Sequence, residues 1–242
     1  MQNVGYFNSV ACEKAGSFVD RTWGSERDVK DIRSSCQARP EGRLAKKSLR
    51  THRRGTGWRC IQGVLFREHQ GWFFESWMHV PPKGSIGWQF NAKPMAIDPI
   101  LWRLVGHEEW NEQPLSWRIL GSVCAPLVVT KIFPEVSTDP DVEAIRLIEW
   151  SNQQLEAFMR NATLQEFVAL LEKIEKPPRG HAITRIATYI LMGDEMTALK
   201  LSADAAAKGG EWRHALLRPW RPQDLFFEGA VSWLKTRNTL LH

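Results

Sequence analysis

The stretch Trp72–Val80, WFFESWMHV, decides the fold because large apolar side chains fall on both sides of its alternation. Trp72 and Phe74 occupy one side, and Phe73 and Trp77 occupy the other. Successive side chains of a strand point to opposite faces, so this stretch predicts a β-strand that is apolar on both faces. One layer of helices covers a single face. We therefore expect other cover on the second face: the N-terminal segment, the sheet's own curvature or a partner.

Further strands flank this one. The turn at 69–71 contains glycine and joins two aromatic strands, which is a hairpin signal. A second turn, PPKG at 81–84, leads to a stretch in which Ile86, Trp88, Phe90 and Ala92 alternate. The expected strands are 57–67, 72–80, 86–92 and 115–130.

The pattern changes near position 139, where amphipathic helices begin. Asp139-Pro140 and Asp98-Pro99 each combine a capping residue with a proline suited to the first helical position. Thr163 and Glu166 form a capping box. In the helix that starts at 139, Val142, Ile145, Ile148 and Leu155 lie near helical spacing and predict a buried face. The expected helices are a short one from Asp98 to Gly106, a long one from Asp139, and those at 163–174, 181–192, 195–208 and 222–237.

This order predicts an α+β fold in which an antiparallel, tryptophan-rich sheet in the first half is packed by a C-terminal set of helices. We expect a weakly structured basic segment over residues 1–47, with a turn at 40–42. A single α+β domain follows over residues 48–242, mostly strands at 48–133 and mostly helices at 139–242.

The composition is that of a globular protein, with 43% hydrophobic and 24% charged residues among 242. No apolar run approaches the roughly 20 residues of a membrane span, and the N-terminus lacks a signal-peptide pattern. We expect a cytoplasmic protein with no membrane contact. The four cysteines have no metal-ligand spacing, so we expect reduced thiols and no metal or cofactor.

The net charge of +5 is concentrated in one run. Between Arg43 and Arg54 there are six arginines and lysines, one histidine and no acidic residue. Such a run is most often a solvated or disordered segment. The alternative is contact with nucleic acid or with an acidic protein.

No catalytic motif is found in the sequence. His107-Glu108-Glu109 lacks the second histidine of a zinc helix, and there is no phosphate-binding loop or nucleophile elbow. Glu75 and His79 are about 13 Å apart if they share a strand, too far for a direct pair. An enzyme would need a constellation assembled from distant residues, such as His79, His107, Glu75 and Glu109.

The stretch Gly57–Gly106, with the KPMAID segment at 93–98 and the Leu101-Trp102 pair, resembles the DUF4304-like bacterial proteins of unknown function. The later ILMGD at 190–194, followed by Ala198-Leu199, is similar to a helix-turn-helix near that group's end. The resemblance spans roughly residues 48–208 and carries no catalytic residues. It implies a strand-rich first half, a helical second half and, at most, a binding protein of the immunity type.

Seven of the twelve tryptophans lie between Trp58 and Trp117, and tryptophan is enriched at interface hot spots. We therefore expect a non-enzymatic, protein-binding protein, an immunity protein of a toxin–antitoxin pair that blocks an acidic bacterial toxin domain. The alternative is a nucleic-acid-associated protein that uses residues 43–54. The expected partner-binding residues are Trp72, Trp77, Trp88, Arg53 and Arg54.

Overall fold

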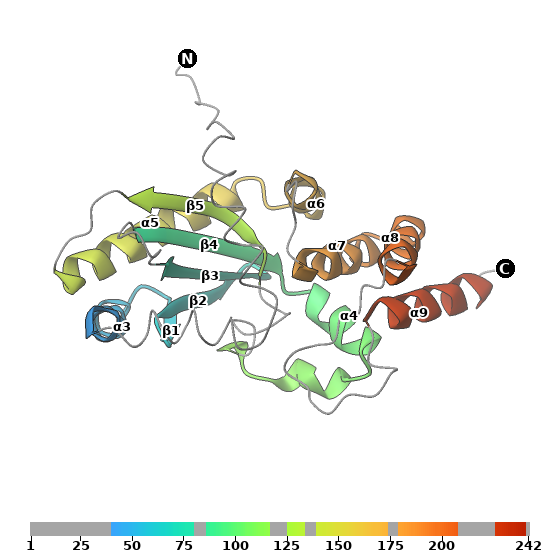
Figure 1. The fold of residues 1–242 in the computed structure, drawn as a ribbon, viewed down its shortest axis with the longest axis horizontal. Helices are drawn as coiled ribbons and strands as arrows, with labels where there is room; N and C mark the ends of the chain where they lie inside the picture. Colours follow the sequence, from blue (N-terminus) through green and yellow to red (C-terminus); the bar gives the residue numbers. More distant parts are fainter. Residues whose placement is uncertain are drawn as a thin grey trace, which may run out of the picture.

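The structure is a computed structural model that describes residues 40–79, 86–116, 125–133, 139–173, 179–207 and 226–240. Within these ranges it is α+β, as the sequence predicts: an antiparallel sheet in the first half and helices that lie mostly after it (Figure 1). Of the expected N-terminal segment, residues 1–39 lie outside the described ranges. No helix in the described part of the chain is long and apolar enough to cross a membrane.

The sheet is a five-stranded antiparallel meander in which each strand pairs with its neighbours in the chain. Short turns between consecutive strands favour this order. The strands at 72–79 and 86–94 confirm the two central predictions. The strands are β1 Arg59–Ile61, β2 Val64–His69, β3 Trp72–His79, β4 Ile86–Pro94 and β5 Leu127–Phe133.

Two strand predictions are wrong in detail. The expected strand at 57–67 is a hairpin, because Gln62 and Gly63 both take positive φ angles (51° and 84°) and reverse the chain between β1 and β2. Of the expected strand at 115–130, residues 115 and 116 are helical in conformation, and residues from Leu127 onward belong to β5. Residues 117–124 lie outside the described ranges.

One face of the sheet is closed by α5, Pro140–Met159, and α6, Leu164–Glu172. Both helices begin as predicted: Asp139 accepts a hydrogen bond from Asp141 N, and Thr163 accepts one from Glu166 N. Ser151 of α5 and Ser76 of β3 share a hydroxyl–hydroxyl hydrogen bond of 2.8 Å. The rest of this core is apolar and largely aromatic. It includes Trp58, Leu65, Trp72, Phe74, Trp88, Phe90, Leu147, Trp150, Leu155 and Phe167.

The basic run that was expected to be solvated or disordered forms most of α3, Pro40–His52. The turn expected at 40–42 is the first turn of this helix, where proline is tolerated because its missing N–H has no helical partner. Strands were expected from residue 48, but the helix continues to 52. It packs on α5 and on β1, and it buries Ser48 and Leu49 against them. In the part of α3 whose side chains are described, residues 46–52, these are the two buried ones.

The remaining helices form a second cluster beside the sheet. Whereas the sequence predicts that the C-terminal helices pack the sheet, three of them gather around α4, Ile97–Leu104 (Figure 1). The backbone of α9 passes close to α4, since a Cβ at Gly229 would lie 2.5 Å from the carbonyl oxygen of Leu104. The three helices are α7 Arg179–Leu191, α8 Glu195–Ala207 and α9 Phe226–Leu240.

His181, near the start of α7, is a buried titratable group in this part of the fold. Burial lowers the pKa of His181 from 6.5 to about 4, because the charged imidazolium loses its hydration. The native protein therefore holds a neutral ring at a pH where the unfolded chain binds a proton. This contribution to stability is complete above pH 6.5 and is lost as the pH falls from 6.5 towards 4.

We expect the free energy of unfolding to be lower at pH 5 than at pH 7 by about 2 kcal/mol through His181 alone. Urea unfolding of the wild type and of His181→Asn at both pH values measures this contribution. The wild type is expected to lose about 2 kcal/mol more than the variant between the two conditions. An equal loss in both proteins contradicts the assignment.

Candidate interaction surface

Two of the tryptophans expected to bind a partner are core residues. Trp72 and Trp88 are only 7% and 2% exposed. Trp72 meets the rings of Phe158 and Phe167 edge-on, and Trp88 packs on Trp150 of α5. The expectation that these indoles form an exposed surface is wrong, because the helices cover the sheet face on which they lie.

Trp77 lies on the opposite face of the sheet and is half-buried, as its place in the alternation requires. It stands across from Val64 of β2, which in turn stands across from Ile61 of β1. On the same face, Phe66 and Phe73 are buried with Ala125. This face is therefore partly apolar and largely covered, and Trp77 is the one predicted tryptophan that keeps some exposure.

Two buried polar pairs also occupy this second face. Asn91 Nδ2 donates to Glu75 Oε1 at 2.7 Å, and the two residues are cross-strand neighbours. Two positions along β4, Lys93 Nζ lies 2.7 Å from Asp98 Oδ1, with both side chains 1% exposed. Asp98 was expected to cap α4, but the cap position is Ala96 and the Asp98 carboxylate pairs with Lys93 instead. The pair fastens the first turn of α4 to the end of β4.

Among the residues of the enzyme alternative, the two glutamates lie in different surroundings. Glu75 is buried in the sheet, whereas Glu109 is solvated on η1, Glu108–Glu112, and bonds His107 at 3.0 Å. That hydrogen bond lowers the pKa of Glu109. The side chain of His79 lies outside what the structure describes. Among the described residues, no group of three His, Cys, Asp or Glu side chains is placed to hold a metal ion.

The outer side of α3 presents cationic side chains to solvent. Lys47 and Arg50, which lie one turn apart, are exposed, and Arg54 follows just after the helix. Arg53 is half-buried and donates through Nη1 to the Trp58 carbonyl at 3.3 Å, so it holds the loop to β1 rather than facing a partner. Of the two arginines predicted to bind a partner, Arg54 is exposed to solvent, whereas Arg53 is half-buried and its hydrogen bond stabilises the fold.

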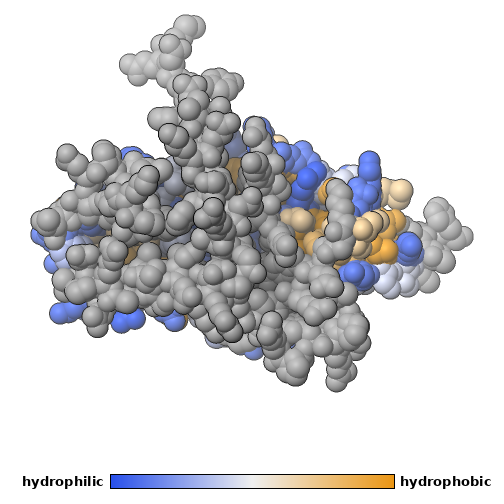
Figure 2. Space-filling model, viewed as in Figure 1, coloured by the Kyte–Doolittle hydropathy of each residue, from blue (hydrophilic) through white to orange (hydrophobic). Residues whose placement is uncertain are grey.

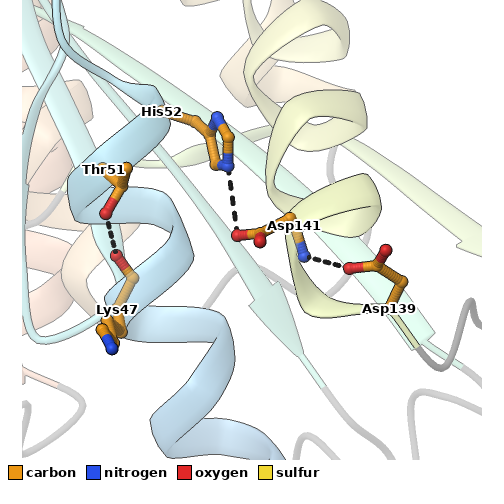
Figure 3. Close-up of polar contacts among 5 residues, drawn as sticks. All are labelled: Lys47, Thr51, His52, Asp139 and Asp141. Carbon is orange, nitrogen blue, oxygen red and sulfur yellow. Dashed lines mark hydrogen bonds and ion pairs between the residues drawn. The ribbon is translucent and has the colours of Figure 1, made fainter.

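The junction of α3 and α5 contains an acidic residue that faces the basic helix (Figure 3). His52 Nε2 lies 3.1 Å from Asp141 Oδ1, and Figure 3 shows the two side chains reaching across from α3 and α5. Hydrogen bonds from Ser48 and His52, together with the nearby charge of Lys47, lower the pKa of Asp141. Its contribution to stability is present above pH 3.8 and is lost as the pH falls through the lowered native value. The contact fixes the start of α5 against α3.

Two aliphatic side chains on α5 remain exposed beside this junction. Val142 follows Asp141 directly, and Ile145 lies one turn further along α5 on the side of Asp141; they are 41% and 40% exposed. Helical spacing predicts a buried face that includes both, but only the neighbouring Ile148 is buried. We call Lys47, Arg50, Arg54, Val142 and Ile145 the α3–α5 surface.

The large hydrophobic side chains that are exposed in the described ranges are all aliphatic or methionine. No tryptophan, tyrosine or phenylalanine is among them, because the aromatic residues are in the cores or half-buried. The α3–α5 surface therefore offers charge and aliphatic contact but no exposed ring. The exposed set is Ile61, Leu127, Val142, Ile145 and Met196.

A second apolar region lies on the other side of the molecule. Figure 2 shows hydrophobic side chains gathered where Figure 1 places the helical cluster of α7 and α8. Met196 of α8, at 70% exposure, is the most exposed large hydrophobic side chain of the described ranges. Several of its neighbours on α8, including Leu199 and Leu201, are half-buried in the helical cluster. This region has no cationic run comparable to that on α3.

Comparisons of the chain with models of protein families, with curated proteins and with solved structures found no match. The resemblance to the DUF4304-like proteins therefore stays a sequence-based expectation.

The buried pair of Lys93 and Asp98 gives a direct test of the sheet's second face. Lys93→Met should destabilise the fold by about 3–5 kcal/mol, because it leaves the Asp98 carboxylate buried without its cation. Adding Asp98→Leu should recover a large part of that loss, since the Asp98 carboxylate that lost its cation is then removed as well. Denaturant unfolding of both single variants and the double variant measures the coupling. Single-variant losses that simply add in the double variant contradict a direct pair.

Proposed function

We propose that this protein is a non-enzymatic protein-binding module of the cytoplasm. In the form that the resemblance implies, it is an immunity protein that binds a bacterial toxin and blocks it sterically. The proposal is supported by the α3–α5 surface: cationic side chains are exposed on and just after α3, and two aliphatic side chains are exposed on α5, the helix on which α3 packs. Such a mixture is what a protein partner uses for orientation and for apolar contact.

The rigidity of the two helices supports binding at this place. Leu49 of α3 is buried, and Trp58 Nε1 donates to Asn152 Oδ1 of α5 at 2.8 Å, so the loop after α3 is held to α5 as well. A docking surface on fixed elements loses little conformational entropy when a partner binds. The helix that carries the cationic side chains is therefore already in place before a partner binds.

The alternative function, binding of nucleic acid, would use the same cationic side chains. Proteins that bind single strands pair a basic groove with aromatic side chains on which bases stack. In the described ranges the large hydrophobic side chains that are exposed are not aromatic. Phosphate contact alone would make binding depend steeply on salt and little on sequence. We therefore favour a protein partner, and the test below separates the two.

The test is capture of a partner from native host lysate on the immobilised full-length chain, with and without nuclease. A column carrying an unrelated protein of the same net charge is the control for non-specific adsorption. We expect a protein that the control column does not hold to be retained after nuclease treatment. Loss of every specific protein on nuclease treatment, with nucleic acid recovered from the untreated column, contradicts the proposal.

A further inference from the structure

We propose that the loop between α3 and β1 binds a phosphate group, free or carried by a small molecule, through two arginine side chains. The two are Arg53, just after α3, and Arg67 of β2, and we call them the loop arginines. Two features support the site: both side chains reach the same short stretch of chain, and neither has an anionic partner among the described residues. The site is separate from the protein-binding role proposed above and does not depend on it.

The loop arginines reach this stretch of backbone from two different elements. Arg53 Nη1 donates to the Trp58 carbonyl at 3.3 Å, and Arg67 Nη1 donates to the Thr56 carbonyl at 3.5 Å. The Arg67 guanidinium also lies over the indole of Trp58, with 5.6 Å between its central carbon and the ring centroid. Two residues of backbone span at most about 7 Å, so the two accepting carbonyls are close neighbours. Both positive charges are therefore held at residues 56–58.

Gly57 allows the Arg67 guanidinium to lie directly against the loop. A Cβ at Gly57 would lie 3.2 Å from the central carbon of that guanidinium and 3.3 Å from each of its terminal nitrogens. The φ angle of Gly57 is +81°, which residues with a side chain rarely adopt. Glycine at this position therefore leaves room for the charged group beside the backbone.

Neither loop arginine is neutralised within the part of the chain that the structure describes. The ion pairs of these residues include neither Arg53 nor Arg67. Both side chains are half-buried, and the Nε of each is buried without a hydrogen-bond acceptor. A partly desolvated cation without a counter-ion costs free energy. A bound anion would offset that cost and would accept from N–H groups that the loop carbonyls leave over.

The charges next to the loop add to the positive potential. Burial raises the pKa of the Cys60 thiol in β1, and the positive charges of Arg50 and Arg53 oppose that rise, which places both near β1. Glu68 is the one acidic residue between positions 43 and 74. As the neighbour of Arg67 in β2, it points to the opposite face of the sheet. The sequence around the loop therefore supplies no internal anion on the side of the loop arginines.

The carboxylates of α5 do not pair with the loop arginines either. The contact between the loop and α5 is made by Asn152, a neutral side chain that accepts from Trp58 Nε1. Glu149 and Glu156 lie about one turn from Asn152 on either side and are exposed, without an ion pair to Arg53 or Arg67. Asp141 lies about three turns before Asn152 and is engaged by His52.

The guanidinium groups favour phosphate as the ligand. Their planar arrangement of N–H donors matches the oxygens of a phosphate or a carboxylate. A phosphate monoester carries a charge of about −1.5 to −2 at neutral pH, which two cations match better than they match a single carboxylate. A nucleic-acid strand would also need exposed rings on which bases stack. None of the exposed large hydrophobic side chains of the described ranges is aromatic.

Isothermal titration calorimetry of the full-length protein with inorganic phosphate, methyl phosphate and acetate tests the site. All titrations are made at one ionic strength, because salt screens the interaction of exposed charges. Arg53→Gln and Arg67→Gln each remove one guanidinium, and Arg67→Lys keeps the charge but loses the planar donors. Arg160→Gln makes the same change of charge at an exposed residue just after α5. Circular dichroism checks that each variant folds.

We expect a single saturable site for both phosphate compounds in the wild type, and about tenfold weaker binding of acetate. Arg53→Gln and Arg67→Gln should each weaken phosphate binding by about tenfold, because each removes charge-assisted hydrogen bonds. Arg67→Lys should retain part of the affinity. Arg160→Gln should bind both phosphate compounds like the wild type.

The absence of saturable phosphate binding to the wild type overturns the inference, and this result does not depend on the folding of any variant. Equal phosphate affinity of the two glutamine variants and Arg160→Gln also overturns it, as does acetate binding as tight as that of phosphate. A DNA duplex whose binding is lost in Arg67→Gln, and which methyl phosphate does not displace, assigns the loop to nucleic acid instead. The first three results do not affect the proposed binding of a protein partner.

Discussion

The packing of α5 on the aromatic face of the sheet is the contact on which the rest of the structure depends. Trp88 and Phe90 of β4 meet Trp150, and Phe74 of β3 meets Phe158 just before α5 ends. Edge-to-face and tilted aromatic contacts add specific geometry to the large apolar area that they bury. They fix the position of α5, and α5 together with β1 then fixes α3. The position of the exposed cations of α3 therefore depends on the aromatic core between α5 and the sheet.

The aromatic residues and the exposed residues of this structure have different roles. The tryptophans and phenylalanines stabilise the fold and leave no fully exposed aromatic ring in the described ranges. The surface is left with cations and a few aliphatic side chains. Charged rims mainly set the rate and orientation of association, whereas buried apolar contacts set how long a complex lasts.

The sequence predicted helices and strands best where a single local pattern decides the conformation. The alternation at Trp72–His79 and the caps at Asp139 and Thr163 depend on neighbours in the chain, and the structure confirms all three. Asp98 followed the same capping pattern, but its carboxylate pairs with Lys93 across a tertiary contact. The hairpin turn at Gln62-Gly63 was missed because glutamine seldom takes a positive φ.

The candidate surface could be predicted only in part. The cations of residues 43–54 were visible in the sequence, but only Ser48 and Leu49 in the described part of α3 are buried, too few to signal a packed helix. Nothing local separates the exposed Ile145 from the buried Ile148, because the difference is which side of α5 meets the core on the sheet. Nor could the sequence show which face of the sheet α5 and α6 would cover. Because they cover the face that carries Trp72 and Trp88, these two are buried, whereas Trp77 on the other face is half-buried.

Hydrogen–deuterium exchange of the full chain, free and bound to the partner captured from the host, tests directly whether α3 and α5 form the binding surface. We expect binding to slow exchange in α3 and in the first two turns of α5, and to leave β2, β3 and α8 unchanged. Slower exchange confined to β2 and β3 around Val64 and Trp77, or to α8 around Met196, would contradict it.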